Sequence, residues 1–183
     1  MFWQQLNAIC TKWEADLSHN KGLTHINENG YARMVAVTDK EDTTRIAVAE
    51  AFIRMSDQTL ETIKAGKMKK GDVIGVAQVA GIMGAKKTSD IIPMCHPLML
   101  TGVDLEFEIL GEGIHILAIV KTIGKTGVEM EALNAVSTAA LTLYDMCKAI
   151  DKEMVIEEIM LIEKVGGKSG HYLKEGHHGR NFR

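Results

Sequence analysis

The sequence predicts an α+β fold, in which an antiparallel sheet carries helices packed on one face in a ferredoxin-like (split β-α-β) arrangement. From residue 45 onward, segments with strand and helix periodicity follow one another in the order β-α-α-β-β-α-β. Two alternating apolar segments, 103–109 and 114–120, flank Gly111-Glu112-Gly113, which indicates a hairpin and therefore antiparallel pairing. One long amphipathic segment, 127–150, is suited to cover one face of such a sheet.

The N-terminal third begins with two further predicted elements. Residues 2–15 carry apolar side chains at helical spacing, which predicts an amphipathic leader helix within a segment 1–22. Asn29-Gly30 favours a hairpin turn and predicts short strands at about 23–28 and 31–37. The alternation from Arg45 to Met55 then predicts the first strand of the main sheet.

The remaining elements complete a single domain at 23–165. Ser56 is expected to cap a short helix that ends at Gly66, where a glycine can take the left-handed conformation. A second helix is expected at about 72–90, and the last strand at Met154–Lys164. Residues 166–183 carry no packing pattern and are expected to form a flexible C-terminal tail.

Both faces of the predicted sheet carry apolar residues, as at Leu117 and Ile119. One face would be covered by helices, so the other face needs a different partner. We therefore expect a homo-oligomer.

The composition narrows the class of protein. The chain has 183 residues, of which 46% are hydrophobic and 25% charged, and its longest apolar runs are too short for the roughly 20 residues that span a bilayer. These features predict a cytoplasmic protein that binds no membrane. A net charge of −3 argues against a nucleic-acid binder. The three cysteines lie far apart, so neither a zinc site nor a disulfide framework is indicated.

One candidate loop, Ile92 to Pro97, contains both prolines of the chain. Pro93 and Pro97 restrict the backbone around Met94, Cys95 and His96, which suits holding an imidazole toward a ligand. The same prolines could simply end the preceding helix and leave His96 as a packed residue. The loop alone leaves both interpretations open.

A second candidate loop links a predicted strand to the long helix. Gly124 and Gly127 would allow a ligand to approach free N–H groups at the start of the helix, and Lys125 adds positive charge. It is not a Walker-type phosphate loop, because position 119 is Ile119 where that motif requires glycine. Glu129 and Glu131 lie in the first turn of the predicted helix, where the helix dipole alone favours carboxylates. Alternatively, one of these carboxylates accepts hydrogen bonds from the N–H edge of a purine- or pterin-like ligand.

Asp145 and Lys148 are three residues apart and therefore neighbours on one face of the long helix. Such pairs are often surface ion pairs of little energetic value. A partly buried pair could instead act as an acid and a base.

Taken together, these segments resemble the cyclic pyranopterin monophosphate synthase family, the MoaC-type enzymes of molybdenum cofactor biosynthesis. The resemblance runs over about 23–170 and is carried most specifically by "GKTGVEMEAL" at Gly124–Leu133 and "IPMCHPL" at Ile92–Leu98. Shorter matches include Lys70-Gly71-Asp72-Val73, Tyr144–Ala149 and Gly166–Gly170.

The resemblance implies conversion of a 3′,8-cyclised dihydro-GTP, made by a partner radical cyclase, into a cyclic pyranopterin monophosphate with release of diphosphate. It also implies a homohexamer built as a trimer of dimers, with sites shared between subunits. No cofactor is implied as required, and a loosely bound Mg²⁺ on the diphosphate is left open. The matching positions imply Lys70, Asp145 and Lys148 as the catalytic group. They imply the following substrate contacts: Arg45, Met94, Cys95, His96, Glu129, Met130, Glu131 and Lys164.

The sequence departs from the family at Ala36, where the family usually has an aspartate after Met34-Val35. This departure supports an alternative, a non-catalytic pterin- or nucleotide-binding relative, whereas the intact group of Lys70, Asp145 and Lys148 argues for an enzyme. Metal binding through the histidines of the tail is the weakest hypothesis, because such residues would hold a metal only loosely.

Overall fold

The computed structural model describes residues 25–26, 29–168 and 170–177, so the predicted leader helix lies outside the described residues. The chain divides into two compact units, residues 1–36 and 37–183. In the first unit, Ile26 and Ala32 form a single antiparallel bridge, and the Arg33 N–H donates to the carbonyl of His25 (2.8 Å). The strand predicted at 31–37 is absent, so that prediction is wrong. Tyr31 and Met34 are exposed, and a short hairpin without apolar packing is only marginally stable.

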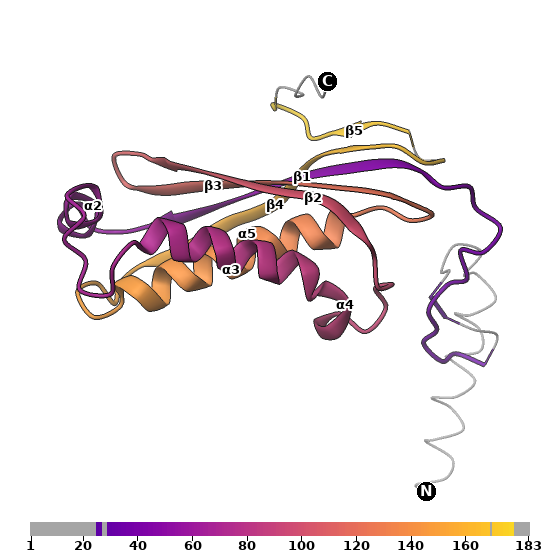
Figure 1. The fold of residues 1–183 in the computed structure, drawn as a ribbon, viewed down its shortest axis with the longest axis horizontal. Coiled ribbons are helices and arrows are strands. Elements are labelled where there is room, and N and C mark those ends of the chain that lie inside the picture. The colour runs from indigo at the N-terminus through magenta and orange to yellow at the C-terminus, as the bar shows by residue number, and fades with distance from the viewer. Residues whose placement is uncertain (1–24, 27–28, 169, 178–183) are drawn as a thin grey trace, which may run out of the picture. The chain divides into compact units, whose positions relative to one another are not determined.

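The second unit is built on a five-stranded antiparallel sheet with the strand order β2-β3-β1-β4-β5 (Figure 1). Its strands are β1 (Thr43–Arg54), β2 (Leu100–Ile109), β3 (Gly113–Gly124), β4 (Val155–Val165) and β5 (Tyr172–Leu173). The described helices are α2 (Asp57–Lys64), α3 (Val73–Lys86), α4 (Thr88–Ile91) and α5 (Glu129–Cys147). The predicted α+β class is confirmed. The ferredoxin-like label stays a prediction.

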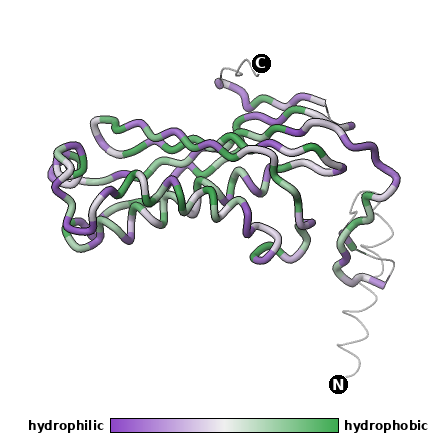
Figure 2. The backbone as a smooth tube through the Cα atoms, in the orientation of Figure 1, coloured by the Kyte–Doolittle hydropathy of each residue, from purple (hydrophilic) through white to green (hydrophobic). Residues whose placement is uncertain are grey.

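The main core lies between the sheet and α3 and α5, which pack on the same face (Figure 1). Alternate residues of β1 and β3 face this core, as the period of two in a strand requires. They are the buried residues Ala47, Ala49, Ala51, Ile53, Ile114, Ile116, Ala118 and Val120. Four of the eight buried side chains of α5 are alanines, which let the helix lie close to the sheet. Figure 2 shows the resulting alternation of hydrophobic and hydrophilic residues along the strands.

The other face of the sheet carries a smaller buried cluster. Val48, Leu117 and Ile162 are buried there, and Ile119 and Met160 pack against them. Leu117 is only 7% exposed within one chain. This face therefore leaves less apolar surface for another subunit to cover than the sequence predicts.

The helix expected at 72–90 is interrupted. It ends at Lys86, and α4 follows after Lys87, whose φ of −106° and ψ of 8° are not helical. Side-chain donors join the main chain at this break: the Thr88 hydroxyl donates to the carbonyl of Ala85 (3.0 Å), and the carbonyl of Gly84 accepts from both the Lys87 N–H (3.1 Å) and the Asn134 amide (2.7 Å). Side-chain bonds of this kind compete with helix continuation.

The C-terminal segment contributes β5, which the sequence does not predict because two residues are too few for a periodic pattern. The other strands and α5 occur where they are predicted, with ends that differ by a few residues. No helix in the described part of the chain is long and apolar enough to cross a membrane.

Candidate active site

The three predicted catalytic residues lie together at the C-terminal end of α5. Lys70 Nζ is 3.0 Å from Asp145 Oδ2 and donates a 2.8 Å hydrogen bond to the Asp145 carbonyl. Lys148 Nζ is 2.6 Å from Asp145 Oδ1. The structure therefore brings Lys70 across 75 residues of sequence to the pair that the helical spacing predicts.

Local structure explains how Lys70 reaches this position. It precedes Gly71, whose φ of +87° is in the region that favours glycine, and Asp72, whose carboxylate caps α3 by accepting from the Gly75 N–H (2.9 Å). Helix α3 packs along α5 over its length. The start of α3 thus delivers Lys70 to the last turn of α5.

The electrostatics of this group favour an ionised Asp145. A carboxylate in the last turn of a helix is disfavoured by the helix dipole. The hydrogen bond from Lys148, followed by that from Lys70, nevertheless lowers the pKa of Asp145, and Asp145 in turn raises the pKa of Lys148. All three side chains are about half exposed, so a substrate can reach them.

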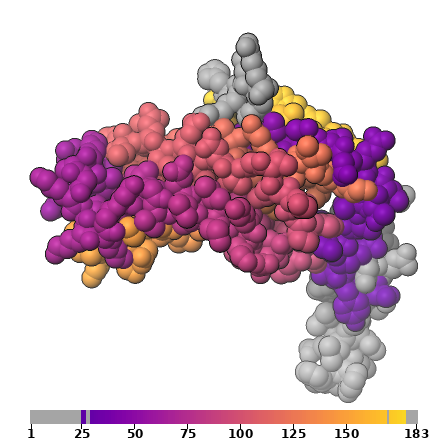
Figure 3. Space-filling view, in the orientation of Figure 1, coloured from indigo at the N-terminus to yellow at the C-terminus, as the bar shows by residue number. Residues whose placement is uncertain are grey.

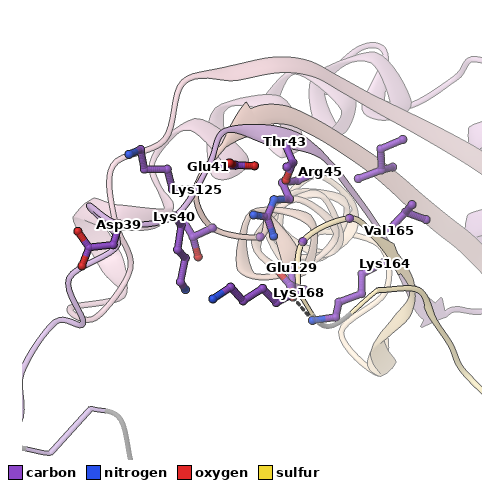
Figure 4. Close-up of a pocket in the computed structure, with 15 residues that line it drawn as sticks. Asp39, Lys40, Glu41, Thr43, Arg45, Lys125, Glu129, Lys164, Val165 and Lys168 are labelled. Atoms are coloured by element: carbon purple, nitrogen blue, oxygen red, sulfur yellow. Dashed lines mark hydrogen bonds and ion pairs between the residues drawn. The ribbon is translucent and has the colours of Figure 1, made fainter.

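A second group of charged residues surrounds a cavity of about 660 Å³ at the opposite, N-terminal end of α5 (Figure 4). Of the predicted substrate contacts, Arg45, Glu129 and Lys164 line this cavity. Lys164 Nζ lies 2.8 Å from Glu129 Oε1, and the Arg45 Nε–H donates to the carbonyl of Gly124 (3.3 Å). The cavity has five basic and three acidic side chains in its lining, which suits a small polyanion.

Glycines let the loops of the cavity come close to its charged side chains. A Cβ at Gly167 would overlap the guanidinium of Arg45, and a Cβ at Gly127 would overlap the carboxylate of Glu129. The cavity also has three basic residues that the predicted set of contacts omits: Lys40, Lys125 and Lys168. The Gly124–Gly127 loop indicates Lys125, and Lys168 falls in Gly166–Gly170, one of the stretches that resemble the family, whereas nothing in the sequence around Lys40 indicates that residue.

The remaining predicted contacts do not line this cavity. Met94, Cys95 and His96 are half-buried in the loop between α4 and β2. Met130 and Glu131 lie in the first turn of α5. Glu131 is only 4% exposed; burial, with a contribution from the charge of Glu129, raises its pKa to about 7. Burial and the nearby Glu131 also raise the pKa of Cys95, which shows that the loop and the start of α5 are neighbours.

The two charged groups are far apart within one chain. Glu129 and Asp145 are 16 residues apart on one continuous helix, which corresponds to about 24 Å along its axis. Among the described residues, no group of three or more histidine, cysteine, aspartate or glutamate side chains could hold a metal ion.

The fold and these two groups define an α+β protein with a lysine–aspartate–lysine centre and a separate basic cavity. Residues 34–167 match the MoaC family, and the chain belongs to that family. It is 64% identical over 153 residues to the cyclic pyranopterin monophosphate synthase of Peptoclostridium acidaminophilum, which covers 84% of this chain and 98% of that protein. It is 63% identical over 156 residues to the protein of the same name from Desulfitobacterium hafniense, which covers 85% of this chain and 96% of that protein. It is 57% identical over 157 residues to the cyclic pyranopterin monophosphate synthase of Geobacillus kaustophilus, which covers 84% of this chain and 97% of that protein.

Proposed function

We propose that the chain is a cyclic pyranopterin monophosphate synthase, which converts 3′,8-cyclo-7,8-dihydro-GTP into cyclic pyranopterin monophosphate and releases diphosphate. The observation that carries this proposal is the convergence of Lys70, Asp145 and Lys148 at the end of α5. The names of the relatives agree with it. Nothing in the structure favours the non-catalytic alternative raised by Ala36.

The proposed chemistry assigns one role to each residue of the lysine–aspartate–lysine centre. Rebuilding a purine-derived ring into a pyranopterin requires protons to be moved between ring atoms, which needs a positioned base and acid. Asp145 acts as the base, since its lowered pKa keeps it ionised. Lys70 acts as the acid, and Lys148 stabilises the negative charge that develops.

The proposed role of the basic cavity is to hold the phosphates. Arg45, Lys125, Lys164 and Lys168 surround it, and such side chains bind phosphate oxygens. In this proposal no cofactor is required, and any Mg²⁺ accompanies the diphosphate as it leaves. The protein works in the cytoplasm, downstream of the radical enzyme that forms the cyclised GTP.

A substrate of this size cannot touch both ends of α5 in one chain, so we propose that a second copy completes each site. Helix α3 offers a surface for that copy, because Val76, Val79 and Met83 are exposed along it. Figure 3 shows the face of the molecule to which α3 contributes. Helix α3 carries apolar residues on its exposed side as well as on its buried side. A helix that is hydrophobic all round is normally buried, so we expect a partner on the exposed side. Two α3 helices packed antiparallel about a twofold axis would bring the lysine–aspartate–lysine centre of one chain toward the α5 N-terminal end of the other. The homohexamer is a trimer of such dimers.

The test of the proposed activity is diphosphate release from the cyclised GTP substrate. Asp145→Ala is expected to lower the rate by two or more orders of magnitude, the scale of losing a positioned acid or base. Glu61→Ala is a matched control, since Glu61 also pairs with a lysine three residues away (3.1 Å) but on the exposed surface of α2. It should leave the rate unchanged. A folded, oligomeric parent that releases no diphosphate would refute the proposed function.

A further inference from the structure

After β4 the chain reverses direction, and β5 runs back along the edge of the sheet (Figure 1). Gly166 and Gly167 turn the chain with φ of +104° and +76°, and together with Lys168 they form one side of the cavity. The chain then forms β5, which pairs antiparallel with β4 at Glu163 and Lys164. The Lys174 N–H extends this pairing by donating to the carbonyl of Ile162 (2.8 Å).

Two histidines of the returning segment contact carboxylates on the sheet. His171 Nε2 lies 2.7 Å from Glu163 Oε1, and the Glu163 side chain is only 3% exposed. His177 Nε2 lies 3.3 Å from Glu50 Oε1, while the other oxygen of Glu50 is 3.1 Å from His115 Nε2. Glu163 pairs across the strands with Val48, which places it on the face away from α3 and α5. Carboxylates as buried as Glu163 need hydrogen-bond donors, and His171 is one.

Strand β4 links these contacts to the cavity. Neighbouring residues of a strand point to opposite faces. Glu163 therefore faces the returning segment, whereas Lys164 faces the helices and contacts Glu129 at the cavity (2.8 Å). The backbone that carries Gly166, Gly167 and Lys168 is held at one end by β4 and at the other by β5 and the His171 contact.

We propose that residues 171–177 are a strap that fixes the Gly166–Lys168 side of the cavity in its anion-binding geometry, with His171 and Glu163 as positioning residues. The ligand is a diphosphate group, and the strap acts on its binding without touching it. An unfastened strap would leave Lys168 free to sample other positions, so binding would have to order it again. The inference rests on the proposed function for the identity of the ligand and for the readout by turnover.

The first test uses inorganic diphosphate and the full-length protein. His171→Ala should weaken diphosphate binding, measured by calorimetry, by roughly three- to tenfold. His171→Gln, whose amide can donate to Glu163, should retain most of the affinity. Lys64→Ala, which removes an exposed ion pair on α2, is the control and should bind as the parent does. Equal affinity of His171→Ala and the parent would overturn the proposal.

Two further readouts separate the strap from general stability and from the proposed function. Hydrogen exchange at the Gly167, Lys168 and Gly170 amides should become faster in His171→Ala, while exchange in α5 stays unchanged. In turnover, KM should rise with kcat preserved; a fall in kcat alone would contradict a positioning role. If the parent has no synthase activity but His171→Ala still shows faster exchange and weaker diphosphate binding, the strap stands and the proposed function fails.

Discussion

Lys70 contacts Asp145 twice, through the carboxylate at 3.0 Å and through the main-chain carbonyl at 2.8 Å. One ammonium group thus satisfies both a side-chain oxygen and a carbonyl of the last turn of α5, which otherwise lacks a helical partner. Lys148 contacts only the other carboxylate oxygen, at 2.6 Å. The two lysines are therefore not equivalent in their effect on Asp145.

This difference predicts an order of pKa changes. Lys148 is the larger cause of the lowered pKa of Asp145 and Lys70 the smaller. Lys148→Ala should therefore raise the pKa of Asp145 more than Lys70→Ala does, as measured by carbon NMR titration of labelled aspartate side chains. Lys64→Ala should have no effect. The reverse order, or no change in either variant, would contradict the geometry described for this site.

The raised pKa of Glu131 should make the stability of the protein depend on pH. Its pKa is about 7 in the folded protein against an ordinary value of 4.5, so the folded state binds its proton more tightly than the unfolded state does. The free energy of unfolding that Glu131 contributes is present below pH 4.5 and is lost as the pH rises to about 7. Urea denaturation should show the parent losing about 1–3 kcal/mol over this range through Glu131.

The variant Glu131→Gln removes the titrating group and should make stability less dependent on pH over that range. Its free energy of unfolding should exceed that of the parent most clearly at pH 8. Glu61→Gln, at an exposed position on α2, serves as the control and should keep the pH dependence of the parent. Parallel curves for the parent and Glu131→Gln would show that Glu131 does not titrate in this range.

A pair of glycine variants tests the close approach at the cavity. Gly167 and Gly170 both have positive φ, so alanine at either position costs about 1 kcal/mol in backbone strain. Only the Cβ at Gly167 would meet Arg45, since that at Gly170 has no atom within 4 Å. Gly167→Ala should therefore weaken diphosphate binding, measured by calorimetry, whereas Gly170→Ala should not. Equal binding by both variants would exclude a role for the Arg45 position.

The sequence predicts those elements best that carry a clear period. The β2–β3 hairpin follows from strict alternation on both sides of Gly111-Glu112-Gly113, and α5 follows from its long apolar stripe. The break at Lys87 depends instead on Thr88 and on Asn134, which lies 47 residues further along the chain. Strand β5 depends on the exposed edge of β4. Tertiary contacts of this kind leave no local pattern.

The candidate site, like the fold, is predictable from the sequence only where a local spacing indicates it. Helical spacing places Lys148 beside Asp145, but it says nothing of Lys70, which only the family resemblance indicates. The composition of the cavity is not predictable from spacing either, since Lys40 and Lys168 are far apart in sequence. The raised pKa of Glu131 is a property of burial, which a charged residue at the start of a helix does not suggest.

The placement of the two charged groups at opposite ends of α5 has a consequence for inactive variants. If each reaction centre combines one end from each of two chains, Asp145→Ala and Lys164→Ala damage different halves of it. A mixed dimer of the two then has one centre with both defects and one with none. Random mixing should restore about a quarter of the parental activity. Two inactive proteins would thus complement each other by exchanging subunits, whereas centres contained within single chains would remain inactive after mixing.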